Sequence, residues 1–298
     1  MTHVATLIAP AGALDKNALK GVLAAMPHAD APVWLAEATA ADIPFSAQGG
    51  LDQQGLAGRL RQAAGEPVDV VVQPLMHRRK KLFLADMDST MIGQECIDEL
   101  ADFVGLKAHV AAITERAMRG EIAFEPALRE RVALLKGLPA KTVEDVIARR
   151  IHLTPGARTL VATMRANGAH TAMVSGGFTL FTDRIGAMIG FNENRANVLL
   201  LDGETLAGGV AEPIFGRDAK RAALVELRNR LGLAKSETMA TGDGANDMDM
   251  IAEAGLGVAF HAKPKVAAAA PARIDHADLS ALLYAQGYRR EEFVEASA

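Results

Sequence analysis

The stretch LFLADMDST, residues 82–90, decides the fold of this sequence. Its first four residues are continuously apolar, which is typical of a parallel strand buried on both faces. Asp86 and Asp88 follow at once, and side chains two apart in extended chain lie on the same face. Two carboxylates so close repel each other unless a cation neutralises them or one takes up a proton. We therefore expect a chemically active site at the end of this strand.

The chain beyond this strand alternates between helical and extended patterns. Strands and helices in alternation predict an α/β domain with a doubly wound parallel sheet, whose ligand lies at the carboxyl ends of its strands. The expected elements are a helix from Pro155 to Asn167, a strand from His170 to Val174, helices from Thr179 to Ile189 and Ala219 to Leu231, a strand from Glu237 to Thr241, a helix from Asp247 to Ala254 and a strand from Leu256 to Ala259.

Residues 94–152 show apolar spacing of helical period and no convincing strand. The expected helices run from Glu95 to Phe103, Lys107 to Met118, Phe124 to Leu135 and Thr142 to Arg150. We interpret this segment as a helical cap inserted into a domain that spans residues 82–298.

Residues 1–75 form a separate pattern with a β-α-β-β-α-β texture, which predicts a small α+β domain. Residues 76–81 link it to the larger domain. The linker contains the basic run His77–Lys81, which has no apolar period. We expect this run to be solvated.

Composition limits the possible partners. The formal net charge is -4, and two Tyr and one Trp offer few stacking surfaces, so we expect a small-molecule ligand and no nucleic acid. The single cysteine, Cys96, excludes an internal disulfide and fits a reducing compartment. No cationic segment precedes the apolar stretch Val4 to Leu14, and no window approaches the roughly 18 apolar residues of a membrane span. We therefore expect a cytoplasmic protein with no membrane contact.

Three further elements fall after predicted strands or at helix starts. Residues 242–247 read GDGAND, in which the glycines permit a tight loop and the acids begin a helix. Ser175-Gly176-Gly177 follows a strand and offers a hydroxyl and backbone N–H groups to phosphate. Lys220 begins a helix and supplies a positive charge for a phosphoryl group or a nucleophile. Carboxylates from Asp86 and Asp243 are hard oxygen ligands of the kind that magnesium prefers.

In this order, the four elements resemble the haloacid dehalogenase superfamily and, within it, the phosphoserine phosphatases, over Leu82 to Tyr288. The resemblance implies that Asp86 is the nucleophile and Asp88 the general acid and base. It implies a Mg²⁺ ion held by the Asp86 side chain, the Asp88 backbone carbonyl and Asp243, with Asp247 in a supporting position. The implied reaction is hydrolysis of O-phospho-L-serine through an aspartyl-phosphate, the last step of serine biosynthesis.

The same resemblance assigns substrate-binding residues in the cap. Glu95, nine residues after Asp86, would bind the substrate ammonium and Arg131 its carboxylate, which Arg grips through two parallel hydrogen bonds. Met118 and Phe124 would form an apolar wall. The phosphate and substrate contacts would come from Ser175, Gly176, Lys220 and Asn246.

Alternatives remain open at this point. One is a phosphotransferase that passes phosphate to homoserine, or a phosphatase for another small ester. Another is a signalling module that is phosphorylated but does not turn over. The N-terminal unit is similar to regulatory ACT domains, which bind free amino acids, although an architectural role or a homodimer through this unit fits equally well.

Overall fold

We analysed a computed structural model that describes residues 1–47, 50–118 and 121–295. Its centre is a six-stranded sheet in which all neighbouring strands pair in parallel. The strand order is β12-β11-β10-β5-β6-β7, so β5 lies inside the sheet, as its apolar sequence requires. The bounds are β5 (Leu82–Ala85), β6 (His170–Phe178), β7 (Glu193–Asn197), β10 (Thr238–Gly242), β11 (Leu256–Phe260) and β12 (Ala272–Ile274).

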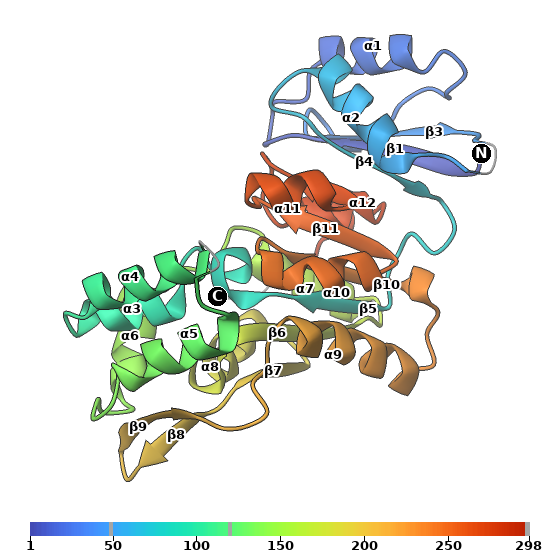
Figure 1. Cartoon of the computed structure of the whole chain (residues 1–298). Coiled ribbons are helices and arrows are strands. Elements are labelled where there is room, and N and C mark those ends of the chain that lie inside the picture. The colour runs from blue at the N-terminus through green and yellow to red at the C-terminus, as the bar shows by residue number, and fades with distance from the viewer. Residues whose placement is uncertain (48–49, 119–120, 296–298) are drawn as a thin grey trace.

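Helices cover both faces of this sheet (Figure 1). Alternate residues of β5 enter different cores, because side chains of a strand point to opposite faces. Phe83 packs with residues of α7 (Ala157–Ala166), α8 (Thr179–Ile189) and α12 (Ala281–Ala285), whereas Leu84 packs with residues of α9 (Arg217–Arg230) and α10 (Met248–Glu253). The short helix α11 (Pro264–Ala269) precedes β12. The predicted doubly wound α/β class is confirmed.

Four helices between β5 and α7 gather at one end of the sheet (Figure 1). They are α3 (Cys96–Phe103), α4 (Lys107–Met118), α5 (Phe124–Ala133) and α6 (Thr142–Arg150). The hairpin of β8 (Leu199–Asp202) and β9 (Thr205–Val210) reaches across to them. Its Leu206 exchanges backbone hydrogen bonds of 2.8 Å with Gly137 and Leu138. The segment predicted as a cap is therefore helical and is held against the core by the hairpin.

The N-terminal residues form an antiparallel sheet with the order β2-β3-β1-β4. The elements occur in the predicted β-α-β-β-α-β order, and both helices lie on one face of the sheet (Figure 1). They are β1 (His3–Ile8), α1 (Lys16–Ala25), β2 (Val33–Ala36), β3 (Ala40–Phe45), α2 (Gln53–Ala64) and β4 (Asp69–Pro74). This unit has its own apolar core between sheet and helices. The exact domain boundaries stay a prediction.

The expectation of a solvated basic linker is wrong for Arg78 and Lys80. The Arg78 guanidinium donates to both carboxylate oxygens of Asp42 at 2.6 Å and to the carbonyl of Ala285 at 2.8 Å. The ammonium of Lys80, a residue only 6 % exposed, donates to the carbonyls of His77 and Ser236 at 2.8 Å. These two residues are largely buried because they pair with polar groups where the N-terminal unit meets the α/β unit, whereas His77, Arg79 and Lys81 are exposed as expected.

A second buried acid fixes the same junction. Asp69, at the start of β4, accepts hydrogen bonds from the backbone N–H groups of Asp275, His276 and Ala277 at 2.8, 3.1 and 3.0 Å. Ile8 of the same sheet joins the core of the α/β unit. The helix-free face of the N-terminal sheet is thus covered by the chain's own α/β unit.

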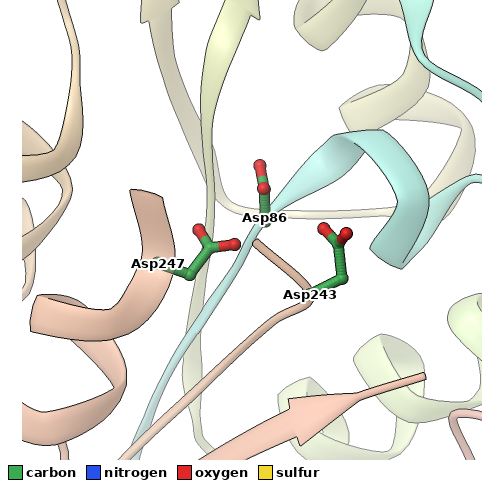
Figure 2. Close-up of side chains that lie close together, drawn as sticks. All are labelled: Asp86, Asp243 and Asp247. Atoms are coloured by element: carbon green, nitrogen blue, oxygen red, sulfur yellow. The ribbon is translucent and has the colours of Figure 1, made fainter. Parts of the chain in front are cut away.

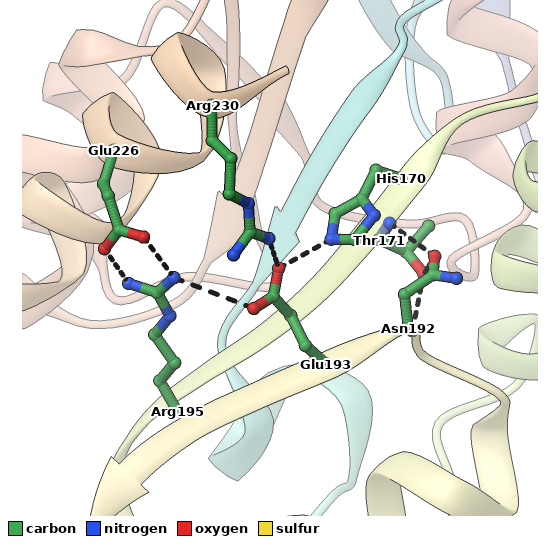
Figure 3. Close-up of polar contacts among 7 residues, drawn as sticks. All are labelled: His170, Thr171, Asn192, Glu193, Arg195, Glu226 and Arg230. Carbon is green, nitrogen blue, oxygen red and sulfur yellow. Dashed lines mark hydrogen bonds and ion pairs between the residues drawn. The ribbon is translucent and has the colours of Figure 1, made fainter.

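The outer strand β7 carries charged side chains that suit an edge position. Glu193 contacts His170 of the neighbouring strand at 2.6 Å and Arg230 of α9, while Arg195 forms a two-pronged pair with Glu226 of α9 (Figure 3). Charged side chains on an edge strand oppose pairing with another sheet. Within the described residues, no helix has both the length and the hydropathy that crossing a membrane requires.

Candidate active site

The candidate site lies where the carboxyl ends of β5, β6 and β10 meet. Asp86 directly follows β5, Ser175 lies in the last part of β6, and Asp243 directly follows β10. Because these parallel strands are neighbours, their ends bring the three side chains to one edge of the sheet. Figure 2 shows the side chains of Asp86, Asp243 and Asp247 lying close together at this edge. One oxygen from each lies within 4.8 Å of the others.

Hydrogen bonds fix the backbone of the turn after β5. Asp86 donates its backbone N–H to the Thr241 carbonyl at 3.0 Å, and its Oδ1 accepts the backbone N–H of Met87 at 2.7 Å. Ser89 then takes a left-handed conformation, with φ of 53°, which turns the chain sharply. Asp88 is not one of the three clustered acids, and its carboxylate accepts the backbone N–H of Cys96 at the start of the cap helix α3.

Lys220 lies beneath the clustered acids and is fully buried. Its ammonium is 2.7 Å from an oxygen of Asp86 and 2.7 Å from an oxygen of Asp247. Burial opposes the positive charge, but the two carboxylates outweigh it and raise the pKa of Lys220. The side chain therefore stays charged and holds the Asp86 carboxylate in one orientation.

The site carries more negative than positive charge. Three buried acids surround one ammonium, and burial followed by the charge of Asp247 raises the pKa of Asp86 well above its usual range. The same two causes raise the pKa of Asp243 to about 6. A hard divalent cation would relieve this repulsion, and three carboxylate oxygens are a suitable donor set. Asp86, Asp243 and Asp247 are thus the residues able to hold such an ion.

Asp88 lies between the clustered acids and the cap. Its Oδ1 accepts the backbone N–H of Cys96 at 3.0 Å, and its Oδ2 accepts the Ser175 hydroxyl at 3.4 Å. Burial, followed by the charge of Glu95, raises the pKa of Asp88 to about 7. A carboxyl group that titrates near neutral pH is suited to both giving and taking a proton.

Two glycines allow groups to come unusually close. A Cβ at position 242 would lie 2.3 Å from the Asp247 carboxyl carbon, so only glycine lets Asp247 reach the site. At Gly177, a Cβ would lie 3.0 Å from a carboxylate oxygen of Asp88 and 3.0 Å from the Ser175 hydroxyl oxygen. The glycines of the sequence motifs are therefore needed for close packing around the acids.

A cavity of about 430 Å³ opens between the clustered acids and the cap. On the core side it reaches Asp86, Asp88 and Asp243, and on the cap side Phe124 and Arg131. A cavity of this size suits a small molecule. Its walls come from both halves of the structure, so the cap helices complete the site.

The two charged cap residues predicted to bind substrate both line this cavity. Glu95 precedes α3, and its carboxylate accepts the Ser89 hydroxyl at 2.7 Å. Arg131 of α5 donates to the carbonyl of Ala127 at 3.3 Å, and burial lowers its pKa although nearby acids oppose this. One anion and one cation thus face the same space, as a zwitterionic ligand requires.

The predicted site residues divide into three groups. Eight line the cavity: Asp86, Asp88, Glu95, Phe124, Arg131, Gly176, Asp243 and Asn246. Ser175, Lys220 and Asp247 lie behind that lining and hold its acids. Met118 ends α4, but its side chain lies outside the described residues. The roles assigned to all of these residues stay predictions.

Sequence reasoning missed two cations of the cavity wall. Arg217 begins α9, and Lys263 immediately precedes α11. Neither belongs to a motif, and each resembles an ordinary solvated residue at a helix start. The sequence offered only their positions as signals: Arg217 directly follows Gly216, and Lys263 lies in the loop after β11.

Comparison with known families matches residues 83–252 to the haloacid dehalogenase-like hydrolases. The chain belongs to this family. A phosphoserine phosphatase from Polaromonas sp. is 45 % identical to this hydrolase over 74 % of the chain and 95 % of its own length. The resemblance inferred from the motifs is therefore confirmed, and the chain is an enzyme of the hydrolase class.

Solved structures agree with this assignment. A HAD family hydrolase from Salmonella enterica serovar Typhi has a TM-score of 0.85 and 28 % identity, covering 98 % of this hydrolase and 99 % of its own chain. A phosphoserine phosphatase solved as a phospho-aspartyl intermediate analogue is 39 % identical, with a TM-score of 0.64, over 69 % of this chain and 98 % of its own. The first match includes the N-terminal unit.

Proposed function

We propose that this hydrolase removes phosphate from O-phospho-L-serine with the help of Mg²⁺, and that Asp86 carries the phosphoryl group between the two halves of the reaction. The main support for the proposal is that Glu95 and Arg131 line the same small cavity as Asp86 and Asp88. The solved relative studied as a phospho-aspartyl analogue supports the same chemistry.

In the proposed first half-reaction, a carboxylate oxygen of Asp86 attacks phosphorus while the bond to the serine oxygen breaks. Lys220 fixes the direction of that carboxylate through its contact at 2.7 Å. Asp88, with a pKa of about 7, donates a proton to the departing serine oxygen. Serine then leaves as the neutral alcohol.

In the proposed second half-reaction, Asp88 has lost its proton and takes one from a water molecule. That water attacks phosphorus, the bond to Asp86 breaks, and phosphate leaves. Mg²⁺, held by the Asp86 side chain, the Asp88 backbone carbonyl and Asp243 with Asp247 in support, would neutralise charge on the transferring group. The hydroxyl of Ser175 and the backbone around Gly176 would receive phosphate oxygens.

The substrate assignment depends on the cap. Phosphoserine carries an ammonium and a carboxylate, and the proposal pairs them with Glu95 and Arg131. Phe124, which packs over Gly176, would close the apolar side. The last step of serine biosynthesis and a cytoplasmic location belong to the same proposal.

The N-terminal unit has a proposed architectural role. Its helix-free sheet face is packed on the α/β unit through Arg78 and Asp69. That face is therefore occupied, so a homodimer through this unit would have to use its helices or the outer strand β2. Binding of a free amino acid by this unit stays a prediction.

A test of the proposed reaction combines a variant with chemical trapping. The wild-type enzyme, mixed with labelled phosphoserine and quenched in acid during turnover, should carry label on the peptide containing Asp86. Asp86→Asn should carry none and should lose turnover. Full turnover by Asp86→Asn would contradict the proposal. Adding homoserine distinguishes a phosphotransferase, because only that enzyme would form phosphohomoserine.

A further inference from the structure

The charges that line the cavity are unequal in number. Four acids face it, namely Asp86, Asp88, Glu95 and Asp243, against the cations Arg131, Arg217 and Lys263. A phosphate monoester brings about two further negative charges at neutral pH. Which cation is free to meet that phosphate therefore matters for binding.

Two of the nearby cations are already paired. Lys220, behind the lining, contacts Asp86 and Asp247 at 2.7 Å each. Arg217 forms a two-pronged pair with Asp249 at 2.6 and 2.5 Å. Arg217 would have to give up this pair to bind a ligand, and Lys220 already uses two of its three N–H groups on Asp86 and Asp247.

The remaining two cations lie on different sides of the cavity. Arg131 belongs to the cap and faces Glu95, where the proposed function places the substrate's carboxylate. Lys263 belongs to the core, in the loop after β11, and its backbone N–H reaches the Asp243 carbonyl at 3.4 Å. The core side is also where the phosphorus atom must lie to meet Asp86.

The ammonium of Lys263 acts on the charge of the clustered acids, but it forms no ion pair with an acid that the structure describes. Burial, followed by the charge of Asp247, raises the pKa of Asp243. Among the charges that lower this pKa, Lys263 has the largest effect. Among the ion pairs found within the described residues, none involves Lys263. Its side chain is exposed at the cavity wall, and the long flexible stem of Lys gives its ammonium reach.

We propose that Lys263 is a phosphate-binding residue that meets the substrate's phosphate, and the phosphate product, from the core side. The inference rests on the proposed function and adds to it a second anion contact, distinct from the carboxylate contact of Arg131. A Lys ammonium acts on phosphate as a point charge, so an Arg at this position should replace it in large part.

The test uses Lys263→Gln, Lys263→Arg and the control Lys265→Gln, which removes an exposed lysine two residues away that does not line the cavity. For each, KM and kcat are measured with L-phosphoserine and with phosphoethanolamine, which has no carboxylate. Inhibition by inorganic phosphate is measured in parallel. Because both lysines are exposed, none of the variants removes a buried group.

Lys263→Gln is expected to raise KM for both esters, and the inhibition constant of phosphate, by about two- to fivefold, the range that an ion pair at an exposed site contributes. The value of kcat should change little, Lys263→Arg should recover most of the binding, and Lys265→Gln should match the wild type. Unchanged phosphate inhibition, or a KM change confined to phosphoserine, would overturn the inference.

Failure of the proposed function would look different. In that case the wild type would show no preference for L-phosphoserine, yet phosphate inhibition and hydrolysis of other esters would still report on Lys263.

Discussion

Replacing Lys220 by Met tests how the active-site acids are held together. The substitution keeps a long apolar stem but removes the charge that lies 2.7 Å from both Asp86 and Asp247. Both acids are buried, at 4 % and 0 % exposure, so they would be left without a cation. Removing one partner of a buried ion pair costs about 3–5 kcal/mol. For a chain of this size that corresponds to a fall in Tm of roughly 10 °C.

The assay is thermal and urea unfolding at pH 7.5 with chelator present, followed by activity measurements. Lys265→Met, at an exposed position, is the control for introducing Met and should unfold like the wild type. Adding Asp247→Asn to Lys220→Met removes one of the two stranded charges and should recover part of the lost stability. If Lys220→Met unfolds within about 1 kcal/mol of the wild type, the buried charge network does not have the role described, because even single pairs of this kind cost more.

Three further predictions concern the cap, the clustered acids and the junction. Arg131→Ala should raise KM for L-phosphoserine roughly 10- to 100-fold, which corresponds to the free energy that a charge-assisted hydrogen bond contributes. Steady-state kinetics should show a nearly unchanged KM for phosphoethanolamine, which has no carboxylate. The metal-free enzyme should lose stability as pH rises from about 4 to 6, because folded Asp243 has a pKa of about 6 and keeps a proton that the unfolded chain releases. The loss in the free energy of unfolding is up to about 3 kcal/mol, and unfolding at about pH 4 and about pH 7.5 should show this loss shrink when Mg²⁺ is added. Arg78→Met should lower the free energy of unfolding by about 3–5 kcal/mol, because buried Asp42 loses its partner. Adding Asp42→Asn should restore part of this stability in urea titrations. No change in either variant would contradict the account of the junction.

Much of the fold could be predicted because its decisive signals are local. The apolar run of β5 followed by Asp86 has no simpler explanation than a buried strand that ends at a site. The helical period of the cap was equally clear. In the N-terminal unit, β3 was harder to recognise, because Asp42 and Pro44 interrupt its apolar pattern. In the folded chain, Asp42 pairs with Arg78.

The parts that could not be predicted depend on contacts between distant segments. Arg78 and Lys80 read as solvated, since their partners Asp42 and Ser236 lie far away in the sequence. Lys263 reads as one of several surface lysines until the fold brings it beside Asp243. The sequence motifs also did not indicate that Lys220 contacts two acids at once, because only the folded chain places Asp247 next to Asp86.

The most direct test of the central claim is steady-state phosphate release from L-phosphoserine, phosphothreonine, phosphoethanolamine and an aryl phosphate, each with Mg²⁺ and with chelator. We predict Mg²⁺-dependent turnover with a strong preference for L-phosphoserine. Hydrolysis of the other esters in preference to L-phosphoserine would contradict the substrate assignment, and equal rates in chelator would contradict the role given to the clustered acids.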